Sequence, residues 1–573
     1  MNYIENYNQW LESDYIDDET KNELLQIAND DKEIEDRFYK ELEFGTAGLR
    51  GIIGAGTNRM NKYNIRKVTQ GLANYICMQG EEAMDRGVAI AYDSRHKSSE
   101  FADEAAFVLN ANGIKTYVFD ALKPTPVLSY AVRTYKCISG IVVTASHNPS
   151  NYNGYKVYWE DGAQIVYPHD EKIIEEVRKI ESLSQVKRTE KRTELYNSID
   201  DSFDTTYIDV VKNQSIAPEL IKEYGENMKV VYTPFNGTGA DFVPRLLKEM
   251  GVKDIFTVKE QFKPDPDFTT TKYPNPEETK NFELALKLAE KKEADIVMGT
   301  DPDADRFACL VRDNAGEYVS LTGNQVGAIF TEYVLSRLEE KEMLSNKGYV
   351  IKSIVTSEMI RTICAEHDVL LVDVYTGFKH IGEAIRKFEE TGVNKYIFGF
   401  EESIGYLLGD YARDKDGMVA SMLMTEILAY AKSKDKNILD LFEDMYQKYG
   451  YYKEFTKSFV FKGIEGEQKI KGIMENLRNN LPTNFGEFKV IETRDYQIGT
   501  ATTIAGEERK LNFRPSNVLY FELENNAWFA IRPSGTEPKV KLYFGVKGKT
   551  NEEAKNLMSS LYEKVTSEIN IKE

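Results

Sequence analysis

The sequence contains very little cysteine: four residues in a chain of 573, namely Cys77, Cys137, Cys309 and Cys364. No two of them stand at C-x-x-C spacing, which excludes a zinc ribbon and a disulfide framework and indicates a reducing compartment. The chain also lacks a run of 18 apolar residues and an N-terminal basic segment followed by an apolar core, so neither a membrane-spanning helix nor a secretory signal is expected. We therefore expect a soluble, cytoplasmic protein.

Positive charge is scarce relative to negative charge. Lys and Arg total 73 against 93 for Asp and Glu, a formal net charge of −20. This balance repels nucleic acid and anionic membranes, so neither is an expected partner, and a phosphorylated ligand would need local Arg, Lys or metal. Hydrophobic residues at 41% and aromatic residues at 12% are enough to build buried cores, and the length predicts roughly three to five domains.

The distribution of apolar residues predicts an α/β protein with a different C-terminal part. Residues 1 to about 44 have helical spacing and no strand-like run, which predicts a helical extension. Apolar, β-branched runs then alternate with helical stretches about three times, which indicates three α/β domains; the runs lie at residues 88–92, 138–144, 229–232, 296–298, 349–355 and 396–400. Strands at 456–461, 518–523 and 528–531 and a helix at 552–565 predict a separate α+β domain. The expected domains are 1–208, 209–322, 323–446 and 447–573.

Four polar segments each follow an apolar strand, where open α/β sheets bind ligands. The first is TASHNP at residues 144–149, continuing through Asn153 to Lys156 as one polar loop. Ser146 could simply cap a helix, and the missing G-x-S-x-G elbow disfavours a hydrolase nucleophile. The concentration of Ser, His, Asn and Lys instead favours a hydroxyl nucleophile with proton carriers beside it.

The second segment is DPDADR at residues 301–306. Its three carboxylates, Asp301, Asp303 and Asp305, alternate along the chain and should point toward one spot, where oxygen ligands suit Mg²⁺. An EF-hand is excluded because its sixth and twelfth positions are Arg306 and Arg312. A solvated acidic turn and a haloacid-dehalogenase type phosphatase, whose nucleophile also begins an Asp-x-Asp, stay as alternatives.

The third and fourth segments offer groups for a sugar and a phosphate. GFEESIG at residues 399–405 provides acceptors suited to sugar hydroxyls, and TGFKH at 376–380 adds Lys379 and His380 upstream. RPSGTEPK at 532–539 combines an Arg fork, hydroxyl donors and a Gly that lets backbone N–H groups approach, which is typical of a phosphate cradle. Each segment alone could be an ordinary surface turn.

Together these motifs, with FGTAGLR at residues 44–50, resemble the α-D-phosphohexomutase superfamily in the family's own order over nearly the whole chain after residue 44. The resemblance implies three α/β domains and a TATA-binding-protein-like C-terminal domain around a central cleft. The helical extension and RDKDG at 413–417 look most like the longer branch, which contains bacterial α-phosphoglucomutases, phosphopentomutases and glucose 1,6-bisphosphate synthases. Phe400 departs from the shorter members, which usually have Gly before the Glu-Glu-Ser.

The resemblance also implies roles for individual residues. Ser146 is expected to carry phosphate, with Mg²⁺ held by that phosphate and by Asp301, Asp303 and Asp305. Stabilising cations are expected at Arg50, Lys156 and Arg306, and the candidate bases are His147, Lys156 and Lys379. The sugar should meet Glu401 and Ser403, and the non-reacting phosphate should meet Arg532, Ser534, Gly535 and Thr536.

The expected activity is a phosphoglucomutase working through glucose 1,6-bisphosphate, with a sugar phosphate as its small-molecule partner. Phosphopentomutase and phosphomannomutase are the alternatives within the family. A Mg²⁺-dependent sugar-phosphate phosphatase and a non-catalytic sugar-phosphate sensor are the alternatives from other classes. Phosphate release would identify the phosphatase, and binding without turnover would identify the sensor.

Overall fold

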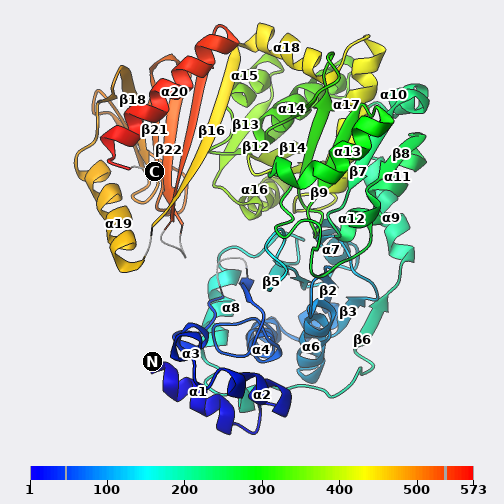
Figure 1. The fold of residues 1–573 in the computed structure, drawn as a ribbon, viewed down its shortest axis with the longest axis vertical. Helices are drawn as coiled ribbons and strands as arrows, with labels where there is room; N and C mark the ends of the chain where they lie inside the picture. The colour runs from blue at the N-terminus through cyan, green and yellow to red at the C-terminus, as the bar shows by residue number, and fades with distance from the viewer. Residues whose placement is uncertain (1, 45–47, 462, 535–538, 572–573) are drawn as a thin grey trace. The chain divides into compact units, whose positions relative to one another are not determined.

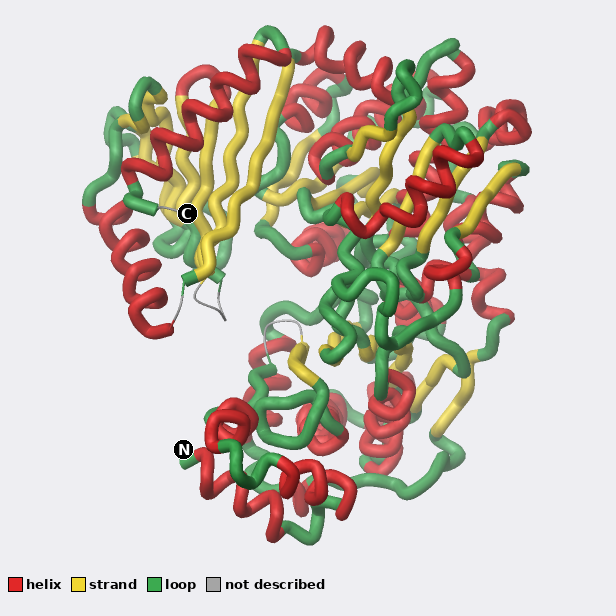
Figure 2. Tube along the Cα trace, viewed as in Figure 1, coloured by secondary structure: helices red, strands yellow, loops and turns green. Residues whose placement is uncertain are grey.

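The computed structural model describes residues 2–44, 48–461, 463–534 and 539–571. Two compact units make up the chain: Met1–Lys352 with Val372–Ile438, and Ser353–Leu371 with Leu439–Glu573. The first unit contains three mixed sheets, and the second contains an antiparallel sheet with helices (Figures 1 and 2). Among the helices of the described ranges, none has the length and hydropathy needed to cross a bilayer.

The expected N-terminal helical extension is confirmed. It consists of α1 (Tyr3–Glu12), α2 (Asp18–Gln26) and α3 (Asp31–Phe38). A polar side chain just before each helix, from Asn2, Asp17 and Asp30 respectively, accepts a hydrogen bond from a first-turn N–H, which satisfies a donor that the helix itself cannot pair. The helices share a small core with the neighbouring α/β domain, made of Tyr7, Leu24, Ile34, Phe38 and Ala55.

The first sheet has six strands in the order β1-β5-β4-β2-β3-β6. Its elements are β1 (Gly48–Ile52), α4 (Lys62–Met78), α5 (Glu81–Arg86), β2 (Val88–Tyr92), α6 (Ser98–Ala111), β3 (Thr116–Phe119), α7 (Thr125–Thr134), β4 (Ser139–Val143), β5 (Tyr152–Trp159), α8 (His169–Arg178) and β6 (Tyr196–Ile199). The expected strands at 88–92 and 138–144 are confirmed as β2 and β4, which pair in parallel.

One expectation for this sheet is wrong. Asn153 to Lys156 do not continue the serine loop but lie in β5, a buried strand antiparallel to β4. Polar residues are tolerated there because their polar groups have partners: the Asn153 amide donates to His96 O at 2.9 Å and to Ser98 Oγ at 3.0 Å.

The second sheet has the order β11-β10-β9-β7-β8. Its elements are α9 (Ser202–Lys212), α10 (Pro218–Tyr224), β7 (Lys229–Thr233), α11 (Val243–Met250), β8 (Asp254–Thr257), α12 (Lys259–Phe262), α13 (Glu283–Lys292), β9 (Ile296–Thr300), β10 (Phe307–Arg312) and β11 (Tyr318–Ser320). β9 lies parallel to β7 and antiparallel to β10, so the aspartate segment is the turn between two buried strands.

The third sheet has the order β13-β12-β14-β15. Its strands, and the helices found with them in the sequence, are α14 (Gly323–Glu340), β12 (Gly348–Ser353), α15 (Met359–Glu366), β13 (Leu370–Val374), α16 (Phe378–Thr391), β14 (Lys395–Glu401), β15 (Gly405–Leu408) and α17 (Gly417–Ser433). β12 and β14 are parallel, while β14 and β15 form the hairpin that carries the Glu-Glu-Ser turn. Each of the three α/β sheets is therefore mixed, and the expected three α/β domains are confirmed.

The C-terminal sheet is antiparallel in the order β16-β23-β22-β21-β18-β19-β20, with β17 on β18. Its elements are α18 (Ile438–Tyr449), β16 (Tyr451–Val460), α19 (Gly463–Asn479), β17 (Asn484–Phe485), β18 (Phe488–Asp495), β19 (Thr500–Thr503), β20 (Glu508–Lys510), β21 (Leu519–Leu523), β22 (Ala527–Pro533), β23 (Lys539–Gly548) and α20 (Asn551–Glu568). Side chains of α19 and α20 share one core with the sheet, and α20 runs along its long strands (Figure 2). The expected α+β domain is confirmed.

Phe38 tests whether the helical extension is held by the small core that it shares with the neighbouring domain. Its side chain is fully buried and packs edge-to-face against Tyr7 and Trp10, with ring centres 5.7 Å apart in each pair. Phe38→Ala should cost about 3 to 5 kcal/mol locally and raise hydrogen exchange throughout α1, α2 and α3. Tyr39→Ala removes a neighbouring ring that is 47% exposed and should leave exchange unchanged. Unchanged exchange in Phe38→Ala would contradict this account of the extension.

Candidate active site

Three buried carboxylates converge in the turn between β9 and β10. Asp301, Asp303 and Asp305 are at most 1% exposed, and one oxygen from each lies within 4.8 Å of the others. Ala304 adopts a left-handed φ of 52° and donates its N–H to Asp301 O at 2.8 Å, which closes the turn. The convergence predicted from the alternate spacing is present, whereas metal ligation stays a prediction.

Two lysines from other parts of the first unit partly neutralise this cluster. Lys156 Nζ, from β5, lies 2.8 Å from Asp303 Oδ2 and 3.3 Å from Asp305 Oδ2. Lys415 Nζ, from the segment before α17, lies 3.0 Å from Asp305 Oδ2. Burial and the neighbouring carboxylates raise the pKa of Asp301 well above its ordinary value. Burial acts to raise the pKa of Asp303, but the charge and hydrogen bond of Lys156, a hydrogen bond with Asp301 and the charge of Lys415 together lower it below its ordinary value.

The carboxylates retain unused oxygen atoms that fit a divalent cation. Within the described residues, Asp303 Oδ1 and Asp305 Oδ1 are buried and accept no hydrogen bond. A buried carboxylate oxygen without a donor is costly unless a cation neutralises it. An all-oxygen donor set is the kind that Mg²⁺ prefers. The residues present therefore fit a magnesium ion.

Ser146 lies directly against this cluster. Its Oγ donates to Asp301 Oδ2 at 2.7 Å and lies 3.1 Å from His147 Nδ1. The residue follows β4, has a left-handed φ of 52°, and the chain then turns directly into β5. The alternative interpretation of Ser146 as a helix cap is wrong, because no helix follows it.

Cationic groups surround His147. Burial lowers the pKa of His147 well below its ordinary value, and the charges of Arg306 and Arg50 lower it further, which favours the neutral form of the imidazole. Arg50, in β1, donates to Asn148 Oδ1 at 3.3 Å. Arg306 donates its backbone N–H to Asp301 Oδ1 at 3.0 Å, and its guanidinium lies 3.8 Å from Glu277.

The third sheet contributes an acidic turn next to the aspartate loop. Glu401 is 6% exposed at the end of β14, and its Oε2 accepts from the Gly377 N–H at 3.1 Å, just before α16. Ser403 is half-buried in the following turn, and Lys379 is half-buried in the first turn of α16. Ile404 O accepts from the Phe307 N–H at 3.0 Å, which joins this turn to the end of the aspartate loop.

The predicted phosphate cradle belongs to the second unit. Arg532 is half-buried in β22 opposite Lys541 of β23, and the Ser534 N–H donates to Lys539 O at 3.0 Å. Gly535 and Thr536 lie outside the described residues. The role of this hairpin end in phosphate binding stays a prediction.

Sequence reasoning missed several residues of the first unit's site. Lys415 lies inside the motif RDKDG, which by itself indicates only the longer branch of the family. Thr125, at the start of α7, donates its hydroxyl to Asp303 Oδ2 and its N–H to Asp303 O, both at 2.9 Å, and no sequence pattern marks it. Tyr273 packs edge-on against His147 with ring centres 5.7 Å apart, from a long loop of the second domain.

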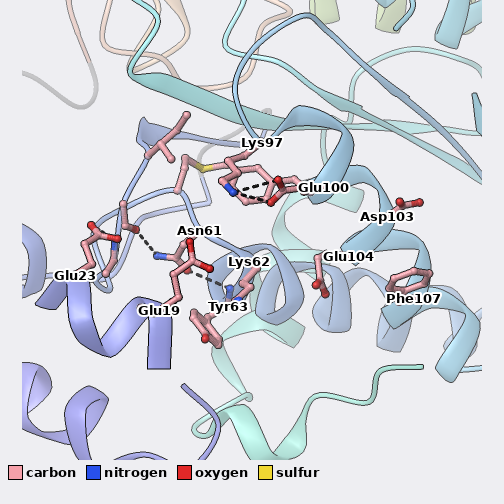
Figure 3. A pocket seen from close by; sticks show the side chains of 16 residues that line it. Glu19, Glu23, Asn61, Lys62, Tyr63, Lys97, Glu100, Asp103, Glu104 and Phe107 are labelled. Carbon is pink, nitrogen blue, oxygen red and sulfur yellow. Dashed lines mark hydrogen bonds and ion pairs between the residues drawn. The ribbon is translucent and has the colours of Figure 1, made fainter. Parts of the chain in front are cut away.

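A separate cavity of about 380 Å³ lies between α2, the start of α4 and α6 (Figure 3). Several of the carboxylates at its rim have cationic partners: Glu23 pairs with Arg37, and Glu100 pairs with Lys97. Glu104 pairs with both Arg66 and Arg188. Nothing in this charge arrangement calls for a ligand.

Comparison with known proteins places the site in a family. Models of phosphoglucomutase/phosphomannomutase match the chain in order: alpha/beta/alpha domain I at residues 41–184, domain II at 205–316, domain III at 322–449 and the C-terminal domain at 494–564. The chain belongs to the phosphoglucomutase/phosphomannomutase family. The resemblance found in the sequence motifs is thereby confirmed, and the chain is a phosphohexomutase enzyme.

Bacterial relatives agree with this assignment, and solved structures share the fold. A phosphoglucomutase of Staphylococcus haemolyticus is 36% identical over 89% of this chain and 91% of that protein. A Staphylococcus epidermidis phosphoglucomutase is 34% identical over 95% of each chain. The fold is similar to the open form of Paramecium parafusin, a phosphoglucomutase, with a TM-score of 0.68 and 18% identity over 93% of this chain and 95% of that one. It is also similar to a Burkholderia thailandensis phosphoglucomutase/phosphomannomutase family protein, with a TM-score of 0.64 and 18% identity over 91% and 97%.

Asp305 tests the metal assignment directly. Mutation of a residue that only hydrogen-bonds a metal ligand typically lowers metal affinity by about 10- to 100-fold. Asp305 is itself a predicted ligand, so Asp305→Asn should weaken Mg²⁺ binding at least about tenfold, as measured by titration calorimetry. Asp241→Asn removes the same charge from an exposed position in the same domain and should leave affinity unchanged. Equal Mg²⁺ affinity in Asp305→Asn and the wild-type protein would contradict the assignment of the metal site to this cluster.

Proposed function

We propose that this enzyme is a phosphoglucomutase that interconverts α-D-glucose 1-phosphate and glucose 6-phosphate through phosphorylated Ser146 and a glucose 1,6-bisphosphate intermediate. The observation that carries the proposal is the Ser146 hydroxyl, 2.7 Å from Asp301 and beside a cluster of carboxylates with unused oxygens. The names of the staphylococcal relatives support glucose as the sugar.

In the proposed reaction, the phosphoryl group of Ser146 passes to the C6 hydroxyl of glucose 1-phosphate. The bond from phosphorus to Ser146 Oγ breaks and the bond to the sugar oxygen forms. A base of the chain takes the proton of the sugar hydroxyl, and Oγ takes up a proton. After the bisphosphate turns around in the site, Ser146 Oγ gives its proton to a base of the chain and bonds to the phosphorus of the C1 phosphate. The bond from that phosphorus to the C1 oxygen breaks, and the C1 oxygen takes up a proton. Mg²⁺ held by Asp301, Asp303, Asp305 and the Ser146 phosphate would neutralise charge on the transferring oxygens.

The proposed catalytic residues are Ser146, His147, Lys156, Arg50 and Lys379. His147 Nδ1 already lies 3.1 Å from the Ser146 hydroxyl, which places it where a proton must move. Lys156 is held by two carboxylates, so its ammonium suits neutralisation of the transferring group. Lys379, in the first turn of α16, is the third proton carrier near the Glu401 turn.

The sugar and the non-reacting phosphate need their own groups. We assign the hydroxyls to Glu401 and Ser403, with Arg306 beside them, because the charge of Glu401 acts on Arg306. The phosphate is assigned to Arg532, Ser534, Gly535 and Thr536, on the chemistry of an Arg fork with hydroxyl and backbone donors. A single cradle for either phosphate lets the bisphosphate react in both orientations.

The wider organisation is proposed as four domains at residues 1–208, 209–322, 323–446 and 447–573. The partner is a sugar phosphate and not nucleic acid, because the net charge of −20 repels polyanions. The cytoplasm is the proposed compartment, since all four cysteines are free.

Pentose and mannose 1-phosphates are the alternative substrates. Phe400 does not decide among them, because it is fully buried and packs against Gly327 of α14.

Phosphate on Ser146 is the direct test of this function. After incubation with glucose 1,6-bisphosphate, peptide mass mapping should find Ser146 phosphorylated, and Ser146→Ala should lose mutase activity. With 1-phosphates of glucose, mannose, ribose and deoxyribose, kcat/KM should be highest for glucose. Preference for a pentose would make the protein a phosphopentomutase, and stoichiometric release of inorganic phosphate would make it a phosphatase.

Arg532 separates a mutase that turns its intermediate from a one-way phosphatase. Losing a hydrogen bond to a charged group costs about 1.5 to 3 kcal/mol, so Arg532→Ala should lower kcat/KM roughly tenfold to hundredfold in both directions. The variant should also release more bisphosphate and depend more on added bisphosphate. Arg509→Ala, at an exposed position in the same unit, is the matched control. A slower variant without an increased bisphosphate requirement would make Arg532 a supporting residue only.

A further inference from the structure

The segment Asp93 to Arg95 follows β2 in the same way that Ser146 follows β4. The two strands are parallel neighbours with Tyr92 opposite Val143, so both loops leave the sheet side by side. The Asp93 N–H donates to Val143 O at 3.1 Å, which ties the two strand ends together. Neither Asp93 nor Arg95 has a role in the reaction proposed above.

Asp93 is linked to Ser146 by hydrogen bonds through the hydroxyl of Thr144. Its fully buried carboxylate accepts from the Arg95 N–H at 3.0 Å, from Ser98 Oγ at 2.7 Å and from Thr144 Oγ1 at 2.6 Å. Thr144 Oγ1 in turn accepts from the Ser146 N–H at 2.8 Å. The Thr144 hydroxyl has a single hydrogen, which it donates to Asp93. Its oxygen lone pairs are therefore left to accept from the Ser146 N–H.

Arg95 holds the other side of the same loop. Its guanidinium is fully buried and donates to four backbone carbonyls: Ser146 O at 2.6 Å, Asn148 O at 2.5 Å, Pro149 O at 2.6 Å and Tyr152 O at 3.1 Å. Its Nε lies 3.2 Å from Asp93 Oδ2, and its plane packs over Phe268 at 4.9 Å. Arg offers such a fork of donors where Lys cannot.

These contacts fix a backbone conformation that serine does not favour. Ser146 has a φ of 52°, in the left-handed region that L-residues other than Gly rarely adopt. Such a conformation persists only where its surroundings determine it. Here both backbone polar groups of Ser146 are bound, the N–H by Thr144 and the carbonyl by Arg95, and the side chain is thereby aimed at Asp301.

We infer that Asp93, Thr144 and Arg95 are positioning residues that hold the Ser146 backbone in its left-handed conformation and so set the reacting oxygen against the aspartate cluster. The inference rests on the proposed role of Ser146 as the phosphate carrier. It predicts that loss of these contacts slows phosphoryl transfer without weakening substrate binding, because a displaced reacting atom lowers the rate of the chemical step.

Thr144 is the position at which to test this, because removal of Asp93 or Arg95 leaves a buried charge unpaired and endangers folding. Thr144→Val keeps the shape of the side chain and removes the hydroxyl. Its kcat should fall about 10- to 100-fold, with KM for glucose 1-phosphate within about threefold of the wild-type value. Thr144→Ser keeps the hydroxyl and should restore most of the rate.

Thr331→Val is the matched control, since Thr331 is also fully buried and donates one hydrogen bond, to Gly327 O at 2.7 Å in α14. It should lose a similar hydrogen bond and keep wild-type kcat. Arg95→Lys retains the positive charge but not the fork, and should resemble Thr144→Val rather than the control. A Thr144→Val enzyme with unchanged kcat would overturn the inference.

Hydrogen exchange gives a readout that does not depend on activity. The Ser146 amide should be protected in the wild-type protein and in Thr144→Ser, and should exchange faster in Thr144→Val but not in Thr331→Val. Equal exchange in all four proteins would overturn the positioning role. If the wild-type protein accepts no phosphate on Ser146, the proposed function fails, and the exchange result alone still decides whether Thr144 fixes this backbone.

Discussion

The buried charge cluster around Asp301, Asp303 and Asp305 is the interaction on which the rest of the first unit depends. Its three carboxylates come from the second sheet, Lys156 comes from the first sheet, and Lys415 comes from the segment after the third. Charges taken out of water are costly unless they are paired, so each domain stabilises the charges of another. Two oxygens of this cluster, Asp303 Oδ1 and Asp305 Oδ1, still accept no hydrogen bond from any described residue, and these are the atoms that a divalent ion would use.

The backbone of the aspartate loop is enclosed as closely as its side chains. A Cβ added at Gly417 would lie 2.8 Å from Ala304 O, and one added at Gly237 would lie 2.3 Å from the Pro302 Cα. The N–H of Gly417 donates to Ala304 O, and that of Thr238 donates to Pro302 O. Close approach on both sides leaves the carboxylates little freedom to move apart. The site is therefore preorganised, which is the condition under which fixed charges stabilise a developing charge most effectively.

The sequence alone identified several of the strands and the polar segments that follow them, but not every strand or how the segments connect. The apolar run at 88–92 and the alternate spacing of Asp301, Asp303 and Asp305 are local patterns, and local patterns can be interpreted from one sequence. Lys415 and Thr125 each lie more than a hundred residues from the three aspartates in the sequence. Their contacts with the cluster therefore depend on tertiary packing. Asn153 to Lys156 were misassigned for a related reason: their polar side chains looked unsuited to a buried strand, but distant partners satisfy them.

The same electrostatics connect metal binding with phosphorylation. A phosphoserine carries a charge of about −1.5 to −2, and the Ser146 oxygen lies 2.7 Å from a carboxylate in a cluster that already retains unneutralised oxygens. Adding phosphate there without a cation would place like charges together in a buried space, which is strongly unfavourable. A divalent ion removes this repulsion, so the metal and the phosphate should each bind better when the other is present. The chain's net charge of −20 reinforces the requirement, because only local cations oppose the negative field that a phosphorylated sugar meets on approach.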